Sequence, residues 1–176
     1  EMIFGELLTS SNYDDSQKRT VGGRNGYGAK LANIFSTEFE IDIVDISTQQ
    51  RYVQTFSNNM TEKTEAKISK KTCTKGYVKF TFKPDLKRFN MQSLDSDTVA
   101  MLEKRTYDAC ACTHDNVGVF YNGKKLAYKN FEKYVDLYLG NRKETHRIYE
   151  SGHRWDVCVC HSEDGYKQVS FVNGIN

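Results

Sequence analysis

The feature that most constrains this chain is a run with four glycines, Gly22-Gly23-Arg24-Asn25-Gly26-Tyr27-Gly28-Ala29-Lys30. Leu31, Ile34 and Phe35 follow at helical spacing, so the run leads directly into a helix. Glycine permits positive φ and lets the backbone approach a ligand without an intervening Cβ, and the first amides of a helix point at an anion. The run therefore predicts a phosphate cradle, to which Lys30 adds a positive charge.

The glycine run differs from the two common phosphate-binding motifs. A P-loop ends in Gly-Lys-Ser/Thr, whereas here Ala29 separates Gly28 from Lys30. Leu31 stands where the P-loop has its magnesium-binding hydroxyl and where a dinucleotide-binding fingerprint has Gly or Ala. That fingerprint also follows a strand, but residues 10–20 are polar and lack periodicity, which is typical of a mobile loop.

Residues 10–30 together are called the lid segment, because a polar loop that ends in a glycine-rich helix start resembles a lid that closes over a nucleotide. The plainer alternative is a glycine-rich surface turn. Arg24, Asn25 and Lys30 can all donate hydrogen bonds to phosphate, and they favour the lid.

At these residues the chain resembles a known family. Residues 2–15, the glycine run and residues 31–37 are similar to the ATP-lid region of eukaryotic-type DNA topoisomerase II. Further similar stretches keep the family's order, namely residues 58–60, 82–86, 121–126, 154–158 and 169–173, so the resemblance spans nearly the whole chain. Bacterial gyrase typically has Leu-His-Gly-Val where this chain has Arg24-Asn25-Gly26-Tyr27, which favours the eukaryotic or large-virus branch.

The resemblance implies an α+β fold. In this superfamily, which unites gyrase, chaperones, histidine kinases and mismatch-repair proteins (GHKL), helices cover a mixed, mostly antiparallel sheet in a two-layer sandwich. Residues 1–127 are expected to be the C-terminal part of the ATPase domain, including its ATP lid. Residues 128–176 are expected to begin a second, α/β domain, the transducer, with the boundary near residue 128.

The resemblance also implies the ATP-binding residues, which we expect to be Ser10, Ser11, Asn12, Gly23, Arg24, Asn25, Gly26, Tyr27, Gly28, Ala29 and Lys30. The implied cofactors are ATP and Mg²⁺. The implied parent enzyme is a homodimeric, nuclear, chromatin-associated topoisomerase that acts on double-stranded DNA and not on membranes, an organelle or a virus being the alternative origin.

No catalytic residue and no metal ligand of the family is expected within this chain. The general-base glutamate and the magnesium-binding asparagine belong upstream, the Gln-Thr-Lys loop belongs downstream, and the DNA-cleaving tyrosine lies far outside. We therefore expect an internal piece of a longer enzyme that is inactive alone.

Two other readings stay open. A net charge of +2 does not by itself suggest nucleic-acid binding, but Lys67, Lys70, Lys71, Lys75 and Lys79 cluster near an expected hairpin. The chain would then be a non-catalytic DNA-interaction module whose glycine run is structural, although solvated faces explain such lysines more simply. The other interpretation, a chaperone or mismatch-repair relative, is disfavoured by the amino-acid sequence of the glycine run.

The five cysteines are an odd number, which argues against a closed disulfide framework and for a reducing compartment. Cys110 and Cys112 are expected to end a helix, and Cys158 and Cys160 are expected to alternate along a strand. Neither pair has the wider spacing and loop setting of a zinc knuckle, so no metal is assigned to them.

Hydrophobic periodicity outlines the elements of the chain. Residues 2–8 carry a helical face, and residues 39–43, 52–56 and 78–82 read as strands of an antiparallel meander. Ser96 is expected to cap a helix whose face carries Val99, Leu102, Thr106 and Ala109.

The C-terminal third has two further local signals. Asn122-Gly123 predicts a tight hairpin turn, and Asn130 predicts the cap of a helix. The helix has apolar residues at helical spacing, and its aromatic residues are expected in the core; the set is Phe131, Tyr134, Val135, Tyr138 and Leu139. Residues 155–160 and 168–172 are expected to be strands joined by the Asp164-Gly165 turn.

Overall fold

The computed structural model describes residues 1–143 and 145–176 and divides into two compact units. Unit 1 comprises Glu1–Lys18 and Gly23–Leu94, and unit 2 comprises Arg19–Gly22 and Asp95–Asn176. Both units are α+β, and their strand ladders within the described residues are all antiparallel, in agreement with the expected fold class. The domain boundary near residue 128 stays a prediction.

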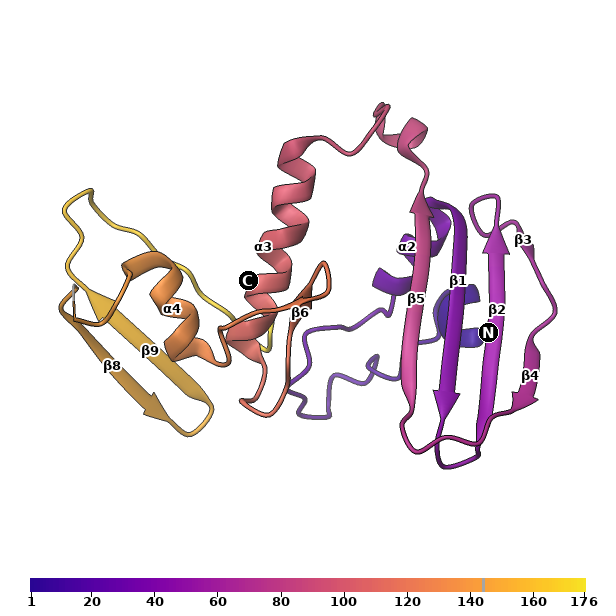
Figure 1. Cartoon of the computed structure of the whole chain (residues 1–176), viewed down its shortest axis with the longest axis horizontal. Helices are drawn as coiled ribbons and strands as arrows, with labels where there is room; N and C mark the ends of the chain where they lie inside the picture. The colour runs from indigo at the N-terminus through magenta and orange to yellow at the C-terminus, as the bar shows by residue number, and fades with distance from the viewer. Residues whose placement is uncertain (144) are drawn as a thin grey trace. The chain divides into compact units, whose positions relative to one another are not determined.

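Unit 1 is built on one antiparallel sheet (Figure 1). Its strands are β1 (Ser36–Asp45), β2 (Gln50–Ser57), β3 (Glu62–Lys63), β4 (Lys67–Lys70) and β5 (Tyr77–Pro84). The three predicted strands are confirmed as β1, β2 and β5. The predicted meander is right for β1 and β2 but wrong for β5, which pairs with β1, because β3 and β4 pair along the other edge of β2. For the same reason, β4 and β5, which carry lysines between residues 67 and 79, do not pair with each other as the expected hairpin.

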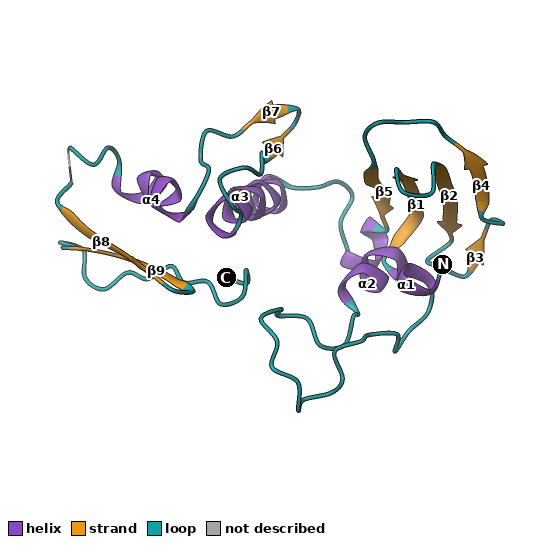
Figure 2. Cartoon of the chain, turned by 90° about the horizontal axis from the view of Figure 1, so that it is seen from below, coloured by secondary structure: helices purple, strands orange, loops and turns teal. Residues whose placement is uncertain are grey.

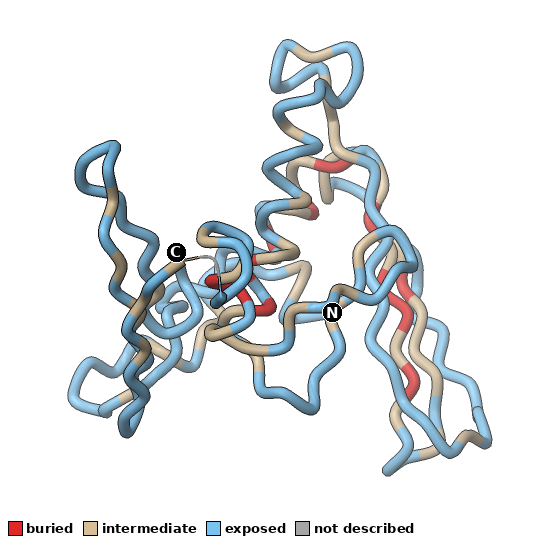
Figure 3. Tube along the Cα trace, turned by 60° about the vertical axis from the view of Figure 1, so that its left-hand side comes forward, coloured by how far each residue is buried: buried red, intermediate tan, exposed pale blue. Residues whose placement is uncertain are grey.

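The core of unit 1 lies on one face of this sheet. Side chains alternate across a strand, and in β1 the buried Phe39 and Ile41 join Phe56 of β2 in a cluster. Two short helices, α1 (Met2–Gly5) and α2 (Gly28–Ile34), contact each other on this face (Figure 2), and Phe4 and Ala32 pack against the cluster. Figure 3 shows the buried positions along these strands.

The helix predicted over residues 2–8 is shorter than expected. It ends at Gly5, and Leu8 has a positive φ of 60°, which no helix interior tolerates. Thr9 donates its hydroxyl to the carbonyl of Glu6 at 3.2 Å, so the chain turns away at this point. Residues 6–9 therefore connect α1 to the lid segment outside any helix.

Edge strand β5 leaves much of its apolar surface uncovered. Val78, Phe80 and Phe82 alternate along it and are 60%, 43% and 52% exposed. They lie on the same face as Phe39 and Ile41 of β1, their register partners being Ile43, Ile41 and Phe39. A short 3₁₀ helix, η1 (Leu86–Phe89), follows β5.

Unit 2 begins with helix α3 (Ser96–Cys112), in which Cys110 and Cys112 lie in the last turn as predicted. Its N-cap is Asp95, whose carboxylate accepts from the amide of Thr98, so the expected cap at Ser96 was one residue late. The predicted hairpin is confirmed, with β6 (Phe120–Tyr121) and β7 (Lys124–Lys125) joined by Asn122-Gly123, both at positive φ.

Helix α4 (Phe131–Leu139) begins where predicted. The side chain of Asn130 accepts from the amide of Lys133 at 2.9 Å. Tyr134 and Val135 are buried, but Tyr138 is 51% exposed, so the expectation that all aromatic residues of this helix are core was wrong for Tyr138. Tyr138 instead places its hydroxyl 3.0 Å from that of Tyr134, an arrangement that suits a half-exposed tyrosine.

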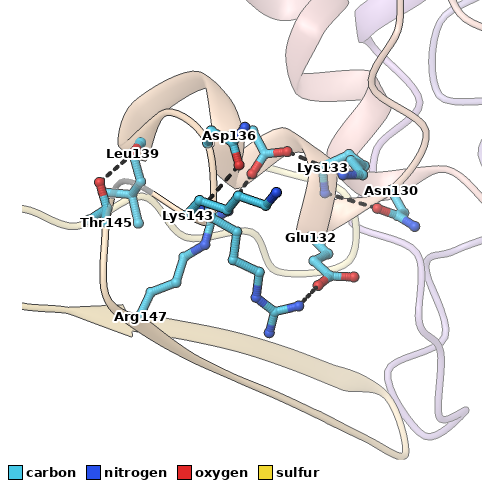
Figure 4. A network of polar contacts seen from close by, with 10 residues as sticks. Asn130, Glu132, Lys133, Asp136, Leu139, Lys143, Thr145 and Arg147 are labelled. Atoms are coloured by element: carbon cyan, nitrogen blue, oxygen red, sulfur yellow. Dashed lines mark hydrogen bonds and ion pairs between the residues drawn. The ribbon is translucent and has the colours of Figure 1, made fainter.

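A second hairpin, β8 (Arg147–Gly152) and β9 (Trp155–Cys160), completes unit 2. The strand at 155–160 is confirmed, but its partner is β8, and residues 168–172 form no strand. Figure 4 shows the polar contacts of α4 and the residues around it, among which Arg147 of β8, whose side chain is 4% exposed, donates to Asp136 at 2.5 Å. β8 was missed because its covered face carries Arg147 and Tyr149 rather than an apolar stripe.

Candidate functional site

Lys30 is the most informative side chain of the lid segment. It lies in the first turn of α2 and is only 2% exposed, although lysine is almost never fully buried without a partner. Its Nζ donates to the carbonyl oxygen of Gly26 at 3.1 Å, which is a neutral acceptor. A buried ammonium with a neutral partner is costly, so an anion brought to this point would be stabilised.

Gly26 shapes the backbone beside this lysine. Its φ of +67° lies in the left-handed region that glycine adopts without strain. A Cβ at this position would lie 3.3 Å from the Cβ of Ser10 and 3.7 Å from the Nζ of Lys30. The structure therefore brings Ser10 next to Gly26 and Lys30, although Ser10 is distant from them in the sequence.

Two hydrogen bonds connect the start of the lid segment to its glycine run. The side-chain amide of Asn12 donates to the carbonyl of Gly23 at 2.8 Å, and the hydroxyl of Tyr13 donates to the carbonyl of Asn25 at 3.4 Å. The amide N–H of Asn12 also donates to the hydroxyl oxygen of Ser10 at 3.1 Å. These bonds hold the serine-asparagine stretch next to the glycine run.

Arg24 has a different setting from Lys30. Its guanidinium forms an ion pair with the Asp15 carboxylate at 2.7 Å, and both side chains are more than half exposed. Arg24 is thus held within the lid segment by a carboxylate that the sequence did not single out. A phosphate that binds Arg24 must compete with this carboxylate.

The remaining predicted residues form an open stretch of backbone. Gly23 and Gly28 have no atom within 4 Å of where a Cβ would be, so a ligand can approach the main chain there. Tyr27 is the N-cap residue of α2, and its carbonyl accepts from the amide of Leu31 at 2.8 Å. Ser11 and Ala29 are exposed.

Sequence reasoning missed Asn33, which is buried in α2 with 1% exposure. The apolar pattern suggested that Leu31 faces the core, yet Leu31 is 45% exposed, and the buried residues of α2 are Lys30 and Asn33. The available signal was an asparagine inside a helix, where its short polar side chain is disfavoured unless tertiary contacts use it.

The C-terminal end of α2 is fixed to the sheet. Asn59 donates to the carbonyl of Ile34 at 3.0 Å and to the carboxylate of Asp85 at 3.1 Å. The hydroxyl of Ser36 donates to the carbonyl of Ala32 at 2.6 Å. These bonds satisfy carbonyls that a helix end leaves without partners, and they fix the position of α2, which carries Lys30.

The described residues contain no group of three His, Cys, Asp or Glu side chains that could hold a metal ion. In the same part of the chain, no helix combines the length and apolar character that a membrane crossing demands. What the lid segment can do chemically is bind an anion: it has a buried ammonium, an exposed guanidinium and accessible main chain.

The chain is similar in sequence to known proteins. DNA topoisomerase 2 of Arabidopsis thaliana is 52% identical over 99% of the chain, and human DNA topoisomerase 2-alpha is 48% identical over 99%. The chain spans 12% of the length of each of these relatives. No protein-family profile matches the chain.

The structure is also similar to solved structures of ATPase domains. The ATPase region of Saccharomyces cerevisiae topoisomerase II has a TM-score of 0.89 and 47% identity, covering 98% of this chain and 46% of that one. The 43K ATPase domain of Thermus thermophilus gyrase B has a TM-score of 0.52 at 16% identity, over 76% of this chain and 38% of its own, and shows the fold alone.

The fold is therefore that of a GHKL-type ATPase domain. Within that class, the chain belongs to the type IIA DNA topoisomerase family and corresponds to part of the ATPase region of topoisomerase II.

Proposed function

We propose that this chain carries the ATP lid of a type II DNA topoisomerase. The observation that carries the proposal is the burial of Lys30 against a neutral acceptor, which favours an anion at the start of α2. In the parent enzyme, ATP binding closes the lid and dimerises two ATPase modules into a gate, and one DNA duplex then passes through a transient break in another. Hydrolysis resets the gate.

The residues of the lid segment have distinct proposed roles. Lys30 and Arg24 contact the phosphates, and Gly23 through Ala29 offer main-chain amides to them. Ser10, Ser11 and Asn12 contact ribose and phosphate. Ser10 lies close to Gly26, and Asn12 hydrogen-bonds to Gly23. These contacts support a single site formed by the serine-asparagine stretch and the glycine run.

ATP, when bound, supplies the charge and the hydrolysable bond, while this chain contributes binding and closure. Mg²⁺ is proposed for the parent enzyme only, with no ligand from this chain. The general base belongs to the parent enzyme as well, so residues 1–176 alone should be inactive. Residues 128–176 are proposed to begin the transducer, which relays nucleotide binding to the DNA gate. A homodimeric parent in the nucleus fits this role.

The test is Lys30→Ala in the full-length parent enzyme, with binding of a non-hydrolysable ATP analogue measured by titration calorimetry. Loss of a charged hydrogen bond to phosphate should weaken binding by about 1.5 to 3 kcal/mol, or roughly 10- to 150-fold. Lys18→Ala is the matched control, since Lys18 is an exposed lysine of the same loop. Unchanged affinity for the Lys30 variant would remove this residue from the site.

The alternative of a non-catalytic DNA-interaction module is tested by measuring DNA binding beside the binding of the ATP analogue. DNA binding with a steep salt dependence, unaffected by nucleotide and accompanied by no analogue binding, would favour a DNA-interaction module. Strand β4 (Lys67–Lys70), whose residues are all exposed, would then be the first place to look.

A further inference from the structure

The lid segment is bracketed by two helices that one side chain joins. It begins after α1 and ends in α2, and the buried side-chain amide of Asn33 in α2 donates to the carbonyl oxygen of Phe4 in α1 at 3.1 Å. The Nδ2 atom must face Phe4, because a carbonyl can only accept. This hydrogen bond therefore connects the two ends of the lid segment at its base.

Helix α1 is itself held on the core. The Phe4 ring lies 4.8 Å from the ring of Phe80 and 6.1 Å from that of Phe39, measured between centroids. Gly5 packs so closely that a Cβ there would come within 2.9 Å of the Phe56 ring. A helix of four residues has little stability of its own, so these contacts set its position.

The same amide fixes the helix that carries Lys30. Positions three apart lie on one face of a helix, and Lys30 and Asn33 are the two buried residues of α2. The Oδ1 atom of Asn33 has no hydrogen-bond partner among the described residues, so the donation to Phe4 is the bond that this side chain makes there. An amide buried for one bond indicates a site where the bond itself matters.

We propose that Asn33 is a positioning residue for nucleotide binding, which rests on the function proposed above. By joining α1 to α2, it holds the base of the lid segment closed and keeps Lys30 directed at the phosphates. Asn33 lies in the last turn of α2, next to Ile34. Without the Asn33 bond, Asn59 still holds this end of the helix to the sheet, but α2 is free to pivot there relative to α1 and to carry Lys30 with it. The consequence is a weaker grip on ATP with no change in the chemical step.

The test uses the full-length parent enzyme with Asn33→Ala and Asn33→Leu. Leucine has the same branched skeleton of four heavy atoms as asparagine but cannot hydrogen-bond, so the second variant fills the site without the bond and separates its loss from the cavity that alanine leaves. Both variants should raise KM for ATP and Kd for a non-hydrolysable analogue by about three- to ten-fold, the worth of one net hydrogen bond. In DNA-stimulated ATP turnover, kcat should stay within about two-fold of the wild type.

Asp42→Asn is the control for a purely structural effect. Asp42 is buried in β1 on the opposite face of the sheet from the helices, and its loss should lower the melting temperature without moving KM. A wild type that binds no nucleotide refutes the proposed function and this inference with it. Wild-type binding with the same Kd in both Asn33 variants refutes the inference alone, as does a kcat that falls in proportion to the rise in KM.

Discussion

Removing the hydroxyl group of Tyr134 should destabilise unit 2 by about 2 kcal/mol. This hydroxyl is buried with its residue at 2% exposure and donates to the Asp108 carboxylate at 2.7 Å, where Asp108 is 5% exposed. A hydrogen bond to a charged group contributes about 1.5 to 3 kcal/mol. Lys104 still pairs with Asp108 at 2.8 Å in a Tyr134→Phe variant, so the loss should stay within that range.

The assay is urea unfolding of the 176-residue chain followed by fluorescence. Trp155 is the single tryptophan and lies in β9, so its emission reports on unit 2. The expected result is a lower midpoint at an unchanged slope, which corresponds to a loss of stability without a change in compactness. Tyr166→Phe is the control, since Tyr166 is 87% exposed, and it should stay within about 0.5 kcal/mol.

The pH dependence of this difference gives a second check. Burial raises the pKa of Asp108, but hydrogen bonds from Lys104 and Tyr134 outweigh it and hold that pKa below its ordinary value. A lowered carboxyl pKa contributes stability above the unfolded value of about 3.9, and this stability is lost as pH falls through the folded pKa. The gap between wild type and Tyr134→Phe should therefore shrink below about pH 4. A loss under 0.5 kcal/mol at neutral pH, or a gap that widens in acid, would refute the reasoning.

Three further substitutions test other parts of the fold. Asp42→Asn should lower the unfolding free energy of unit 1 by about 1.5 to 3 kcal/mol, because Arg51 and Tyr77 hydrogen-bond the carboxylate and lower its pKa. Unfolding followed by far-UV circular dichroism measures this, and a loss below about 0.5 kcal/mol would contradict it. Asn130→Ala should cost about 1 kcal/mol through the lost cap of α4, seen in Trp155 fluorescence, whereas an unshifted midpoint would exclude a capping role. Gly26→Ala should cost about 1 kcal/mol, because an alanine at φ +67° is strained, and should speed proteolysis of the lid segment; equal cleavage rates would argue against it.

Local signals in the sequence predicted much of this structure. The alternation in residues 39–43 gave β1, the Asn122-Gly123 pair gave the hairpin, and Asn130 gave the start of α4. Each of these signals acts within a few residues, where backbone preference and capping decide the outcome. The glycine run was also singled out locally, from its glycine content and the helical spacing after it, whereas Ser10, Ser11 and Asn12 came from the family resemblance.

The remaining features depend on contacts between distant residues. The pairing of β5 with β1 could not be read from either strand, because the neighbour of a strand depends on which sheet edge the other strands leave open. Burial of Asn33 accompanies its contact with α1, and Lys30 is buried beside Gly26, so neither follows from apolar periodicity. The pairing of Asp15 with Arg24 gave no sequence signal, since acidic residues are common in polar loops.

The uncovered flank of unit 1 has a practical consequence. Strand β5 has one edge without a partner strand in the described chain and presents Val78, Phe80 and Phe82 beside it. Such an edge is a template on which another extended peptide can add itself, and aromatic side chains strengthen the attachment. Dilute samples and an early light-scattering check are therefore prudent before the thermodynamics of unit 1 are interpreted, because self-association would make its melting concentration-dependent.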